Sequence, residues 1–451
     1  MLEDIIKERS KKKAELEKLG LDLYPSRVKR THLASEALKD FPALSKKRTK
    51  IWLAGRLLGL RVQGGVAFAD LTDGSWGKIQ IVFTKAKLTN FQTLKDNLDI
   101  GDFVEVSGPL FKTKKGEKSI EAKSLRVIVK TLQPLPSVWH GLQDIEERFR
   151  KRYLDLLLNA DVRGQLVKRS RIVEQLRKSL ADEGFLEVET PVLQPIPGGA
   201  KARPFKTHHN ALDVDFYLRV APELYLKRLL VGGMEKVFEL GKVFRNEGMD
   251  RDHNPEFTEL ELYWAYQDYK GLMKFAQKLL KKLIPATAGK PGKWSTVTFA
   301  DIFKKHSGKD YKSVPADKLD ETFKHEVRPK IVEPTFVTDY PEAVMPLAKL
   351  HEKDKSLTES FQLIVNGAEI VKGFSELNDP VFQRAQMERQ EKAFRAGDEE
   401  SSRKDEDFLE ALEYGMPPAA GLGIGIDRLV AIATKAHAVK EIILFPTLRP
   451  K

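Results

Sequence analysis

The chain contains no cysteine among its 451 residues, which excludes disulfides, thiolate zinc sites and a cysteine nucleophile. It has no apolar run of about eighteen residues, the length that a membrane-spanning helix requires. The N-terminal segment MLEDIIKERSKKKAELEKLG mixes charges of both signs and lacks the apolar core of a signal peptide. These absences predict a cytoplasmic protein without a membrane partner.

The two common phosphate-binding loops are also missing. No GxxxxGK[ST] segment occurs, and the glycine spacing of GLGIGID (421–427) does not fit GxGxxG. A nucleotide-binding site of the P-loop or dinucleotide type is therefore excluded. Any nucleotide must be held in another way.

The chain is basic. Lys and Arg total 77 against 65 Asp and Glu, which gives a net charge of +12 and a pI near 9.3. A surplus of this sign favours a polyanionic partner, and nucleic acid is one interpretation. A soluble protein that happens to be basic is the other. The length predicts two to three domains.

The first part of the chain predicts a helical extension followed by a small barrel. Residues 1–48 form the extension, with a charged helix over 5–20 that ends at Gly20. Residues 49–135 contain five β-rich runs, a number typical of a Greek-key barrel of the OB type. The runs are 51–62, 66–74, 78–83, 103–111 and 119–129.

Barrels of this type bind single-stranded nucleic acid through aromatic and polar side chains on one face. Candidates for stacking on bases are Phe68, Trp76 and Phe83. Candidates for hydrogen bonding are Arg56, Arg61 and Gln80. The alternative for each aromatic residue is a place in the barrel core.

A second domain is expected after a linker at 136–150 and covers residues 151–451. Leu166, Val173, Leu176 and Leu180 recur at helical spacing, and the helix that they predict ends at Gly184. A helix-rich stretch over about 271–332 has the character of an insertion.

Three segments of this domain form an ordered set of motifs. They are GFLEVETPVLQPIPGGA (184–200), VFRNEGMDRDHNPEFTELELYWAY (243–266) and GLGIGIDRLVAI (421–432). Together they resemble the three signature motifs of class II aminoacyl-tRNA synthetases. The resemblance implies an α+β fold, with the OB barrel followed by an antiparallel sheet flanked by helices.

Amino-acid activation is an attack by a carboxylate on the α-phosphorus of ATP, so the enzyme must align two anions and neutralise growing charge. A guanidinium can hold carboxylate and phosphate oxygens together. The resemblance places Arg245 in that role and Arg428 over the adenine, and it makes both residues catalytic. An arginine in a β-run is otherwise more often a surface ion-pair partner. The resemblance implies these ATP contacts: Arg245, Glu247, His253, Asn254, Phe257, Glu369, Gly425 and Arg428.

The segments 197–233, 374–380 and 443–450 narrow the resemblance to lysyl-tRNA synthetases, and it covers nearly the whole chain. A pocket for lysine must offer carboxylates to a buried ammonium. A pocket for aspartate would instead need a cation. The resemblance implies these lysine contacts: Gly199, Glu223, Arg245, Glu261, Tyr263 and Glu376.

The same resemblance assigns the barrel to the anticodon of tRNA(Lys). Phe68 would stack on a base, while Arg61, Gln80 and Glu117 would read neighbouring edges. Unstacked loop bases are the part of RNA that side chains can read. The segment around Pro191 implies a homodimer.

Two positions depart from the family pattern. Gln362 stands where a second metal-binding glutamate is usual, seven residues before Glu369, and Lys372 replaces an asparagine. The segment 360–371 predicts a hairpin that turns at Asn366-Gly367 and puts Gln362 and Glu369 on one face. A bulge near Val371 to Gly373 is needed if Lys372 is also to face the site.

We hypothesise that Lys372 takes over part of the task of a Mg²⁺ ion, so that fewer ions bind beside ATP. The alternatives are lineage drift, with Lys372 facing the substrate carboxylate or solvent, and altered substrate choice. The predicted function is lysine activation by ATP followed by transfer to tRNA(Lys). Two rivals stay open: a lysine-activating paralogue that modifies a protein, and a non-catalytic RNA-binding relic. Truncated paralogues of the first kind lack the barrel.

Overall fold

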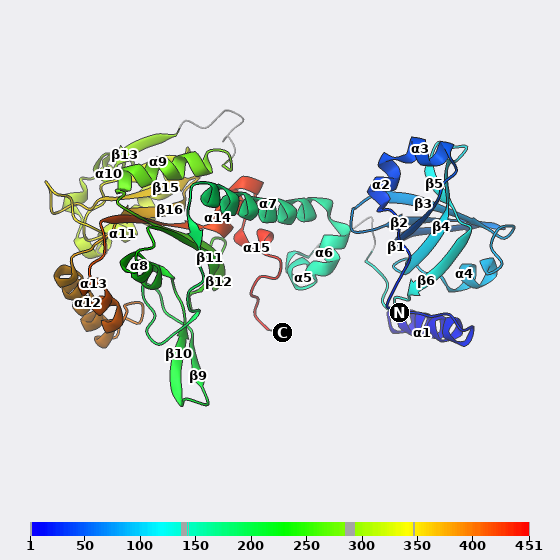
Figure 1. Cartoon of the computed structure of the whole chain (residues 1–451), viewed down its shortest axis with the longest axis horizontal. Helices are drawn as coiled ribbons and strands as arrows, with labels where there is room; N and C mark the ends of the chain where they lie inside the picture. The colour runs from blue at the N-terminus through cyan, green and yellow to red at the C-terminus, as the bar shows by residue number, and fades with distance from the viewer. Residues whose placement is uncertain (1, 137–141, 143, 285–293, 346–347, 451) are drawn as a thin grey trace. The chain divides into compact units, whose positions relative to one another are not determined.

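A computed structural model describes residues 2–136, 142, 144–284, 294–345 and 348–450. The chain divides into two compact units, Met1–Asp144 and Ile145–Lys451. Figure 1 shows both units, and each is described by itself. Within the described residues, no helix combines the length and the apolar character needed to cross a bilayer.

The first unit is a closed barrel. Its strands pair in the order β1-β2-β3-β5-β4-β6, and an additional β1–β4 pairing closes the sheet. The strands are β1 (Lys50–Gln63), β2 (Val66–Thr72), β3 (Lys78–Thr84), β4 (Phe103–Lys112), β5 (Lys118–Glu121) and β6 (Ser124–Val129). The predicted OB barrel is confirmed, with its fifth run divided into β5 and β6.

In the part of this unit that the structure describes, helices α1 (Leu2–Lys18), α2 (Ala34–Lys39), α3 (Phe41–Lys46) and α4 (Phe91–Asn97) accompany the barrel. Helix α1 is fixed by Arg9, whose guanidinium donates to Thr131 Oγ1 at 2.9 Å and to the Ile100 carbonyl at 3.1 Å. Lys12 of the same helix forms an ion pair with Asp99 at 2.9 Å. The N-terminal extension is therefore part of the barrel unit.

The second unit is built on an eight-stranded sheet of order β13-β14-β15-β16-β17-β12-β11-β7. Its pairs are antiparallel except β13–β14 and β11–β7 at the two edges. The strands are β7 (Leu186–Glu187), β11 (Lys236–Phe244), β12 (Glu256–Ala265), β13 (Ser295–Thr298), β14 (Thr335–Thr338), β15 (Ser360–Val365), β16 (Ala368–Ser375) and β17 (Ala419–Gly425). A smaller sheet of order β8-β10-β9 lies apart from it: β8 (Leu193–Gln194), β9 (Lys206–His209) and β10 (Val214–Leu218).

Helices cover both faces of the large sheet. The longer helices are α7 (Ala160–Asp182), α8 (Glu223–Val231), α9 (Tyr269–Leu280), α10 (Phe299–Ser307), α12 (Pro380–Arg395), α13 (Glu406–Glu413) and α14 (Ile426–Thr434). The shorter ones are α5 (Ile145–Arg150), α6 (Arg152–Leu158), η2 (Tyr311–Ser313), α11 (Ala316–Thr322), η3 (Phe323–Val327), η4 (Arg328–Lys330) and α15 (Val439–Ile442).

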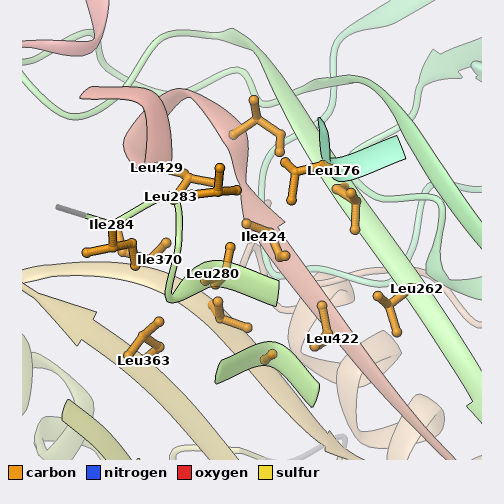
Figure 2. Close-up of a cluster of buried hydrophobic side chains, with 14 of the residues drawn as sticks. Leu176, Leu262, Leu280, Leu283, Ile284, Leu363, Ile370, Leu422, Ile424 and Leu429 are labelled. Carbon is orange, nitrogen blue, oxygen red and sulfur yellow. The ribbon is translucent and has the colours of Figure 1, made fainter. Parts of the chain in front are cut away.

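The largest core lies between the sheet and helices α7, α9 and α14. Figure 2 shows Leu176, Leu280 and Leu429 of these helices around Leu422 and Ile424 of β17. Alternate residues of the sheet strands therefore point into this core. The side chains between them face the opposite side, where α8, α12 and α13 pack over β11, β12 and β17.

Two boundaries differ from the expected ones. Residues 145–150, expected in the linker, form α5, whereas 137–141 and 143 lie outside the described residues. The stretch 271–332 is helix-rich as expected, but α9 contributes to the largest core and β13 extends the sheet. Residues 285–293 of it lie outside the described residues.

Candidate active site

Three glycines of β17 create the space for the site. Gly421, Gly423 and Gly425 stand opposite Tyr263, Glu261 and Glu259 of β12. A Cβ atom on Gly421 would lie 2.4 Å from Glu376 Oε1 and 2.4 Å from the Tyr263 ring. Neighbouring side chains thus occupy the space that a side chain on these glycines would fill.

Two buried carboxylates converge beside this strand. Glu223 begins α8, and Glu376 follows β16, with exposed fractions of 7% and 1%. A buried lysine, Lys227, lies between them: its Nζ is 2.6 Å from Glu223 Oε1 and 2.5 Å from Glu376 Oε2. Glu376 Oε1 is buried and has no hydrogen-bond partner among the described residues.

Burial raises the pKa of Glu376, and the Lys227 ammonium opposes that rise. Burial alone would lower the pKa of Lys227, but Glu223 and Glu376 outweigh it and hold that pKa above its ordinary value. Lys227 was missed by sequence reasoning, because a lysine four residues after a glutamate on a helix is usually a surface partner.

Glu261 and Tyr263 form the wall of the pocket on β12. Tyr263 Oη donates to Glu261 Oε2 at 3.0 Å, and both side chains are buried. Burial is the main cause of the raised pKa of each group. Gly199 completes the pocket at a φ of +90°, where an added Cβ would lie 2.7 Å from the Glu223 Cβ. The structure therefore brings together the expected lysine contacts on α8, on β12, after β16 and at Gly199.

Arg245 lies at the end of β11, close to the same face. Its guanidinium carbon is 5.0 Å from the centre of the Phe257 ring, and Nη2 is 3.8 Å from Glu259 Oε2. Burial raises the pKa of Glu259, Arg245 lowers it, and Glu369 raises it further. Glu259 was also missed, although its two-residue spacing from Glu261 places both acids on one face of β12.

Arg428, in the third motif, contacts two other parts of the expected nucleotide site: the loop that carries His253 and the strand that carries Glu369. Its Nη2 donates to His253 Nε2 at 2.8 Å, and its Nη1 donates to the Glu369 carbonyl at 3.3 Å. Gly425 is the N-cap of α14, one turn before Arg428.

The loop that carries His253 holds the rest of the expected nucleotide contacts. His253 Nδ1 lies 2.9 Å from Asp250, and the Asn254 amide donates to the Glu256 carbonyl at 2.6 Å. Glu247 is exposed. Glu247 precedes this loop in the chain and stays a predicted nucleotide contact.

The predicted hairpin turns at Asn366 and Gly367, with φ of 50° and 75°. In its register Gln362 pairs with Lys372, and Lys372 pairs with Gly423. The register shift places the predicted bulge at Ile370, next to Val371, at the near end of the expected range. The bulge lets Glu369 and Lys372 share the face of Gln362, as the hypothesis requires.

The side chains on this hairpin differ in their surroundings. Gln362 is buried, and its Oε1 accepts a hydrogen bond of 2.9 Å from Tyr340. Glu369 is half-buried, whereas Lys372 is exposed. Within the described ranges, the Lys372 ammonium has no ion-pair partner.

In the barrel unit, the strand register places Arg61 opposite Phe68 and pairs Gln80 with Asp70 and Ser119. Arg61, Phe68 and Gln80 therefore share the outer face. Arg61 is exposed, Phe68 is half-buried, and Gln80 accepts from Ser119 Oγ at 3.0 Å. Glu117 is exposed in the turn before β5.

One of the barrel candidates is wrong, and another already has a partner within the barrel. Phe83 is 1% exposed and packs on Phe91 in the core, at 5.9 Å between ring centres. Arg56 is held on the ring of Phe103 at 4.3 Å, so its guanidinium belongs to the barrel wall. Trp76 stays a candidate, because it is 51% exposed.

Comparisons with known proteins cover both units. Residues 144–449 match the family model for tRNA synthetases class II (D, K and N), and residues 51–128 match the model for the OB-fold nucleic acid binding domain. A lysine–tRNA ligase of Carboxydothermus hydrogenoformans is 44% identical, over 100% of this chain and 99% of that protein. Lysine–tRNA ligases of Chloroflexus aurantiacus (44%; 100% and 99%) and Pelotomaculum thermopropionicum (42%; 100% and 96%) are similar to the same extent.

Proposed function

The chain belongs to the class II tRNA synthetases and, among them, to the lysine–tRNA ligases, and from this premise we propose how its residues divide the work. The enzyme joins lysine to tRNA at the expense of ATP. The observation that carries the residue assignments is the pair of buried acids, Glu223 and Glu376, on the same sheet face as Arg245.

The acid pocket binds the side-chain ammonium of lysine. Glu376 Oε1 is a buried acceptor that is free to receive a hydrogen bond, and Tyr263 closes the wall beside it. Glu261 and Gly199 bind near the α-amino group. A buried ammonium is tolerated only where carboxylates compensate for its lost water, and this pocket meets that need.

The nucleotide binds along Arg245, Phe257 and Arg428. Phe257 lies under the adenine, and Arg428 covers the other face by a cation–π contact, with His253, Asn254 and Gly425 beside it. Arg245 holds the lysine carboxylate and the α-phosphate together. The carboxylate oxygen then attacks phosphorus, the bond to pyrophosphate breaks, and lysyl-adenylate forms. Glu259 keeps the guanidinium in position before the substrates arrive.

A Mg²⁺ ion in this family would be held by Glu369 together with ATP phosphates. Mg²⁺ bound to nucleotides typically takes one or two carboxylates, so Glu369 alone meets the lower requirement. The Gln362 oxygen is engaged by Tyr340, and no group of three or more acids, histidines or cysteines in the described part of the chain is arranged around a metal. When bound, the ion neutralises phosphate charge, and we propose that fewer ions bind than is usual.

The barrel binds the anticodon of tRNA(Lys) through Phe68, Arg61, Gln80 and Glu117. Arg61, Phe68 and Gln80 share the outer face, and the exposed Arg61 and half-buried Phe68 on it support this role, although Gln80 is buried against Ser119. We propose a homodimer formed through the segment around Pro191. Leu186, Val192 and Leu193 are 53%, 40% and 47% exposed there, and exposed apolar side chains that lie together mark interaction sites. The enzyme would work in the cytoplasm, where charged tRNA is used.

Two assays test the proposal. Exchange between ATP and pyrophosphate, measured with each of the twenty amino acids, should depend on lysine above all others. Charging of tRNA(Lys) should then follow, which separates this enzyme from one that modifies a protein. Absence of lysine-dependent exchange would leave only an RNA-binding relic.

A further inference from the structure

We infer that Lys227 is a positioning residue that sets the charge of the lysine pocket, keeping it at one net negative charge to match one incoming ammonium. The inference rests on the proposed function of Glu223 and Glu376. Lys227 is 2% exposed and makes its two ion pairs, at 2.6 and 2.5 Å, with the same carboxylates that are proposed to bind substrate. The pocket therefore already contains one lysine side chain that belongs to the protein.

The arrangement leaves room for a second ammonium. Lys227 engages Glu223 Oε1 and Glu376 Oε2, whereas Glu376 Oε1 is turned toward Gly421 and Tyr263 on the sheet. This oxygen is buried and has no hydrogen-bond partner among the residues that the structure describes. Lys227 thus forms the back of the pocket, and the substrate approaches from the sheet side.

Charge counting explains why an internal cation is needed. Two carboxylates buried without a counter-ion repel each other, and burial disfavours their charged forms, so that one of them would take up a proton. A protonated carboxyl no longer attracts an ammonium by charge. The Lys227 ammonium, in contact with both carboxylates, opposes that proton uptake, and the three groups in their charged forms sum to one net negative charge.

The groups that face Lys227 come from several elements. Glu223 lies on the same helix, Glu376 follows β16, and Tyr263 belongs to β12. The Lys227 Nζ is 5.9 Å from the Tyr263 ring centre and 5.7 Å from that of Phe374. A cavity beside α8 is lined by Gly199, Glu223 and Lys227 together with Gln383 and Gln390 of α12 and Arg403. The acids that titrate against Lys227 are therefore those of the pocket itself.

The test compares Lys227→Met with wild type in lysine-dependent exchange from about pH 7 to pH 9. We expect kcat/KM for lysine to fall at least about tenfold at pH 7, the equivalent of one pKa unit. The loss should shrink as pH rises, because the protonated carboxyl regains its charge. Lys227→Arg, which keeps the charge, should retain the wild-type pH profile.

The chain offers a matched control in the barrel. Lys130 is likewise fully buried between two carboxylates, with its Nζ 2.7 Å from Asp102 and also paired with Asp99. Lys130→Met disrupts an ion cluster of the same kind, at a position far from the pocket residues in the sequence. It should lower the melting temperature but leave kcat/KM for lysine, and its pH profile, as in wild type. Free lysine itself titrates over this pH range, and the profiles of Lys227→Arg and Lys130→Met correct for that titration.

Three results would overturn the inference. A wild-type kcat/KM in Lys227→Met would show that the charge does not matter, and an equal loss at every pH would show a merely structural role. A lower KM for lysine would show that Lys227 competes with the substrate. If Lys227→Met does not fold, Lys227→Gln is judged by the same criteria. Failure of wild type itself to exchange would instead refute the proposed function.

Discussion

Substituting Gly421 by alanine should damage the lysine pocket while leaving the nucleotide site intact. The added Cβ would lie 2.4 Å from Glu376 Oε1 and 2.4 Å from Tyr263 Cε1, whereas carbon contacts are normal at about 3.5–4.0 Å. Both neighbours are buried, so the strands must separate or the side chains must move by about 1 Å. Forcing extra atoms into a packed site typically costs about 1–3 kcal/mol.

The cost should appear mainly in binding of lysine. A displacement of about 1 Å in a substrate-positioning group can reduce turnover about 100-fold. We expect kcat/KM for lysine to fall by about that factor, and the melting temperature to fall by a few degrees. KM for ATP should stay within about twofold of the wild-type value, because the nucleotide contacts Gly425 and Arg428 come later in the chain than the substituted residue. The assay is pyrophosphate exchange with lysine and ATP varied in turn.

Gly164→Ala is the matched control. Gly164 lies in α7, and an added Cβ there meets nothing within 4 Å. Alanine should stabilise that helix by about 1 kcal/mol and leave exchange unchanged. If Gly421→Ala retained wild-type kcat/KM for lysine, the acids would not depend on the bare strand, and the proposed geometry of the pocket would be wrong.

Three further predictions concern other parts of the chain. Phe68→Ala should weaken tRNA binding by about 1–3 kcal/mol, seen as a higher KM for tRNA in charging, while exchange without tRNA stays unchanged; equal loss in both assays would contradict a stacking role. Gln362→Glu should lower the Mg²⁺ concentration needed for ATP binding about tenfold in calorimetry, and an unchanged Mg²⁺ dependence would show that Gln362 does not limit the site. Burial opposes ionisation of Asp99, but hydrogen bonds from Lys130 and Lys12 outweigh it and hold the pKa of Asp99 below its ordinary value. The stability that Asp99 contributes is present above about pH 4 and is lost as pH falls. The melting temperature of wild type should therefore fall more in acid than that of Asp99→Asn. Equal decreases in the two proteins would refute this prediction.

The sequence predicted the elements whose residue types are tied to chemistry. Arg245 and Arg428 lie in the second and third motifs, the acids Glu223 and Glu376 lie in the segments 197–233 and 374–380, and the structure gathers them on one sheet face. Lys227 could not be predicted in the same way. Its spacing from Glu223 fits an exposed helical pair as well as a buried one, and only the sheet below α8 decides between them.

The barrel shows where the alternation of strands would have helped and where it would not. Phe68 falls in phase with half-buried neighbours of β2, and Phe83 falls in phase with the buried Ile79 and Ile81 of β3. The period of two alone separates the two aromatics. The bulge at Ile370 is different, because apolar residues at both 370 and 371 fit a regular strand and a bulged one equally well.

The glycines of β17 also constrain where such a site can be built. Each glycine inside a strand costs roughly 0.5–1 kcal/mol in chain entropy, and three at alternate positions leave one side of the ribbon without any side chain to anchor it. At the margin of a sheet this segment would fray. The segment is stable because β12 and β16 form hydrogen bonds to it on either side. Its side chains Ala420, Leu422 and Ile424 also pack into the hydrophobic core beneath the sheet. A site surface made of glycine backbone therefore has to lie on a central strand of a wide sheet, where the two neighbouring strands stabilise it.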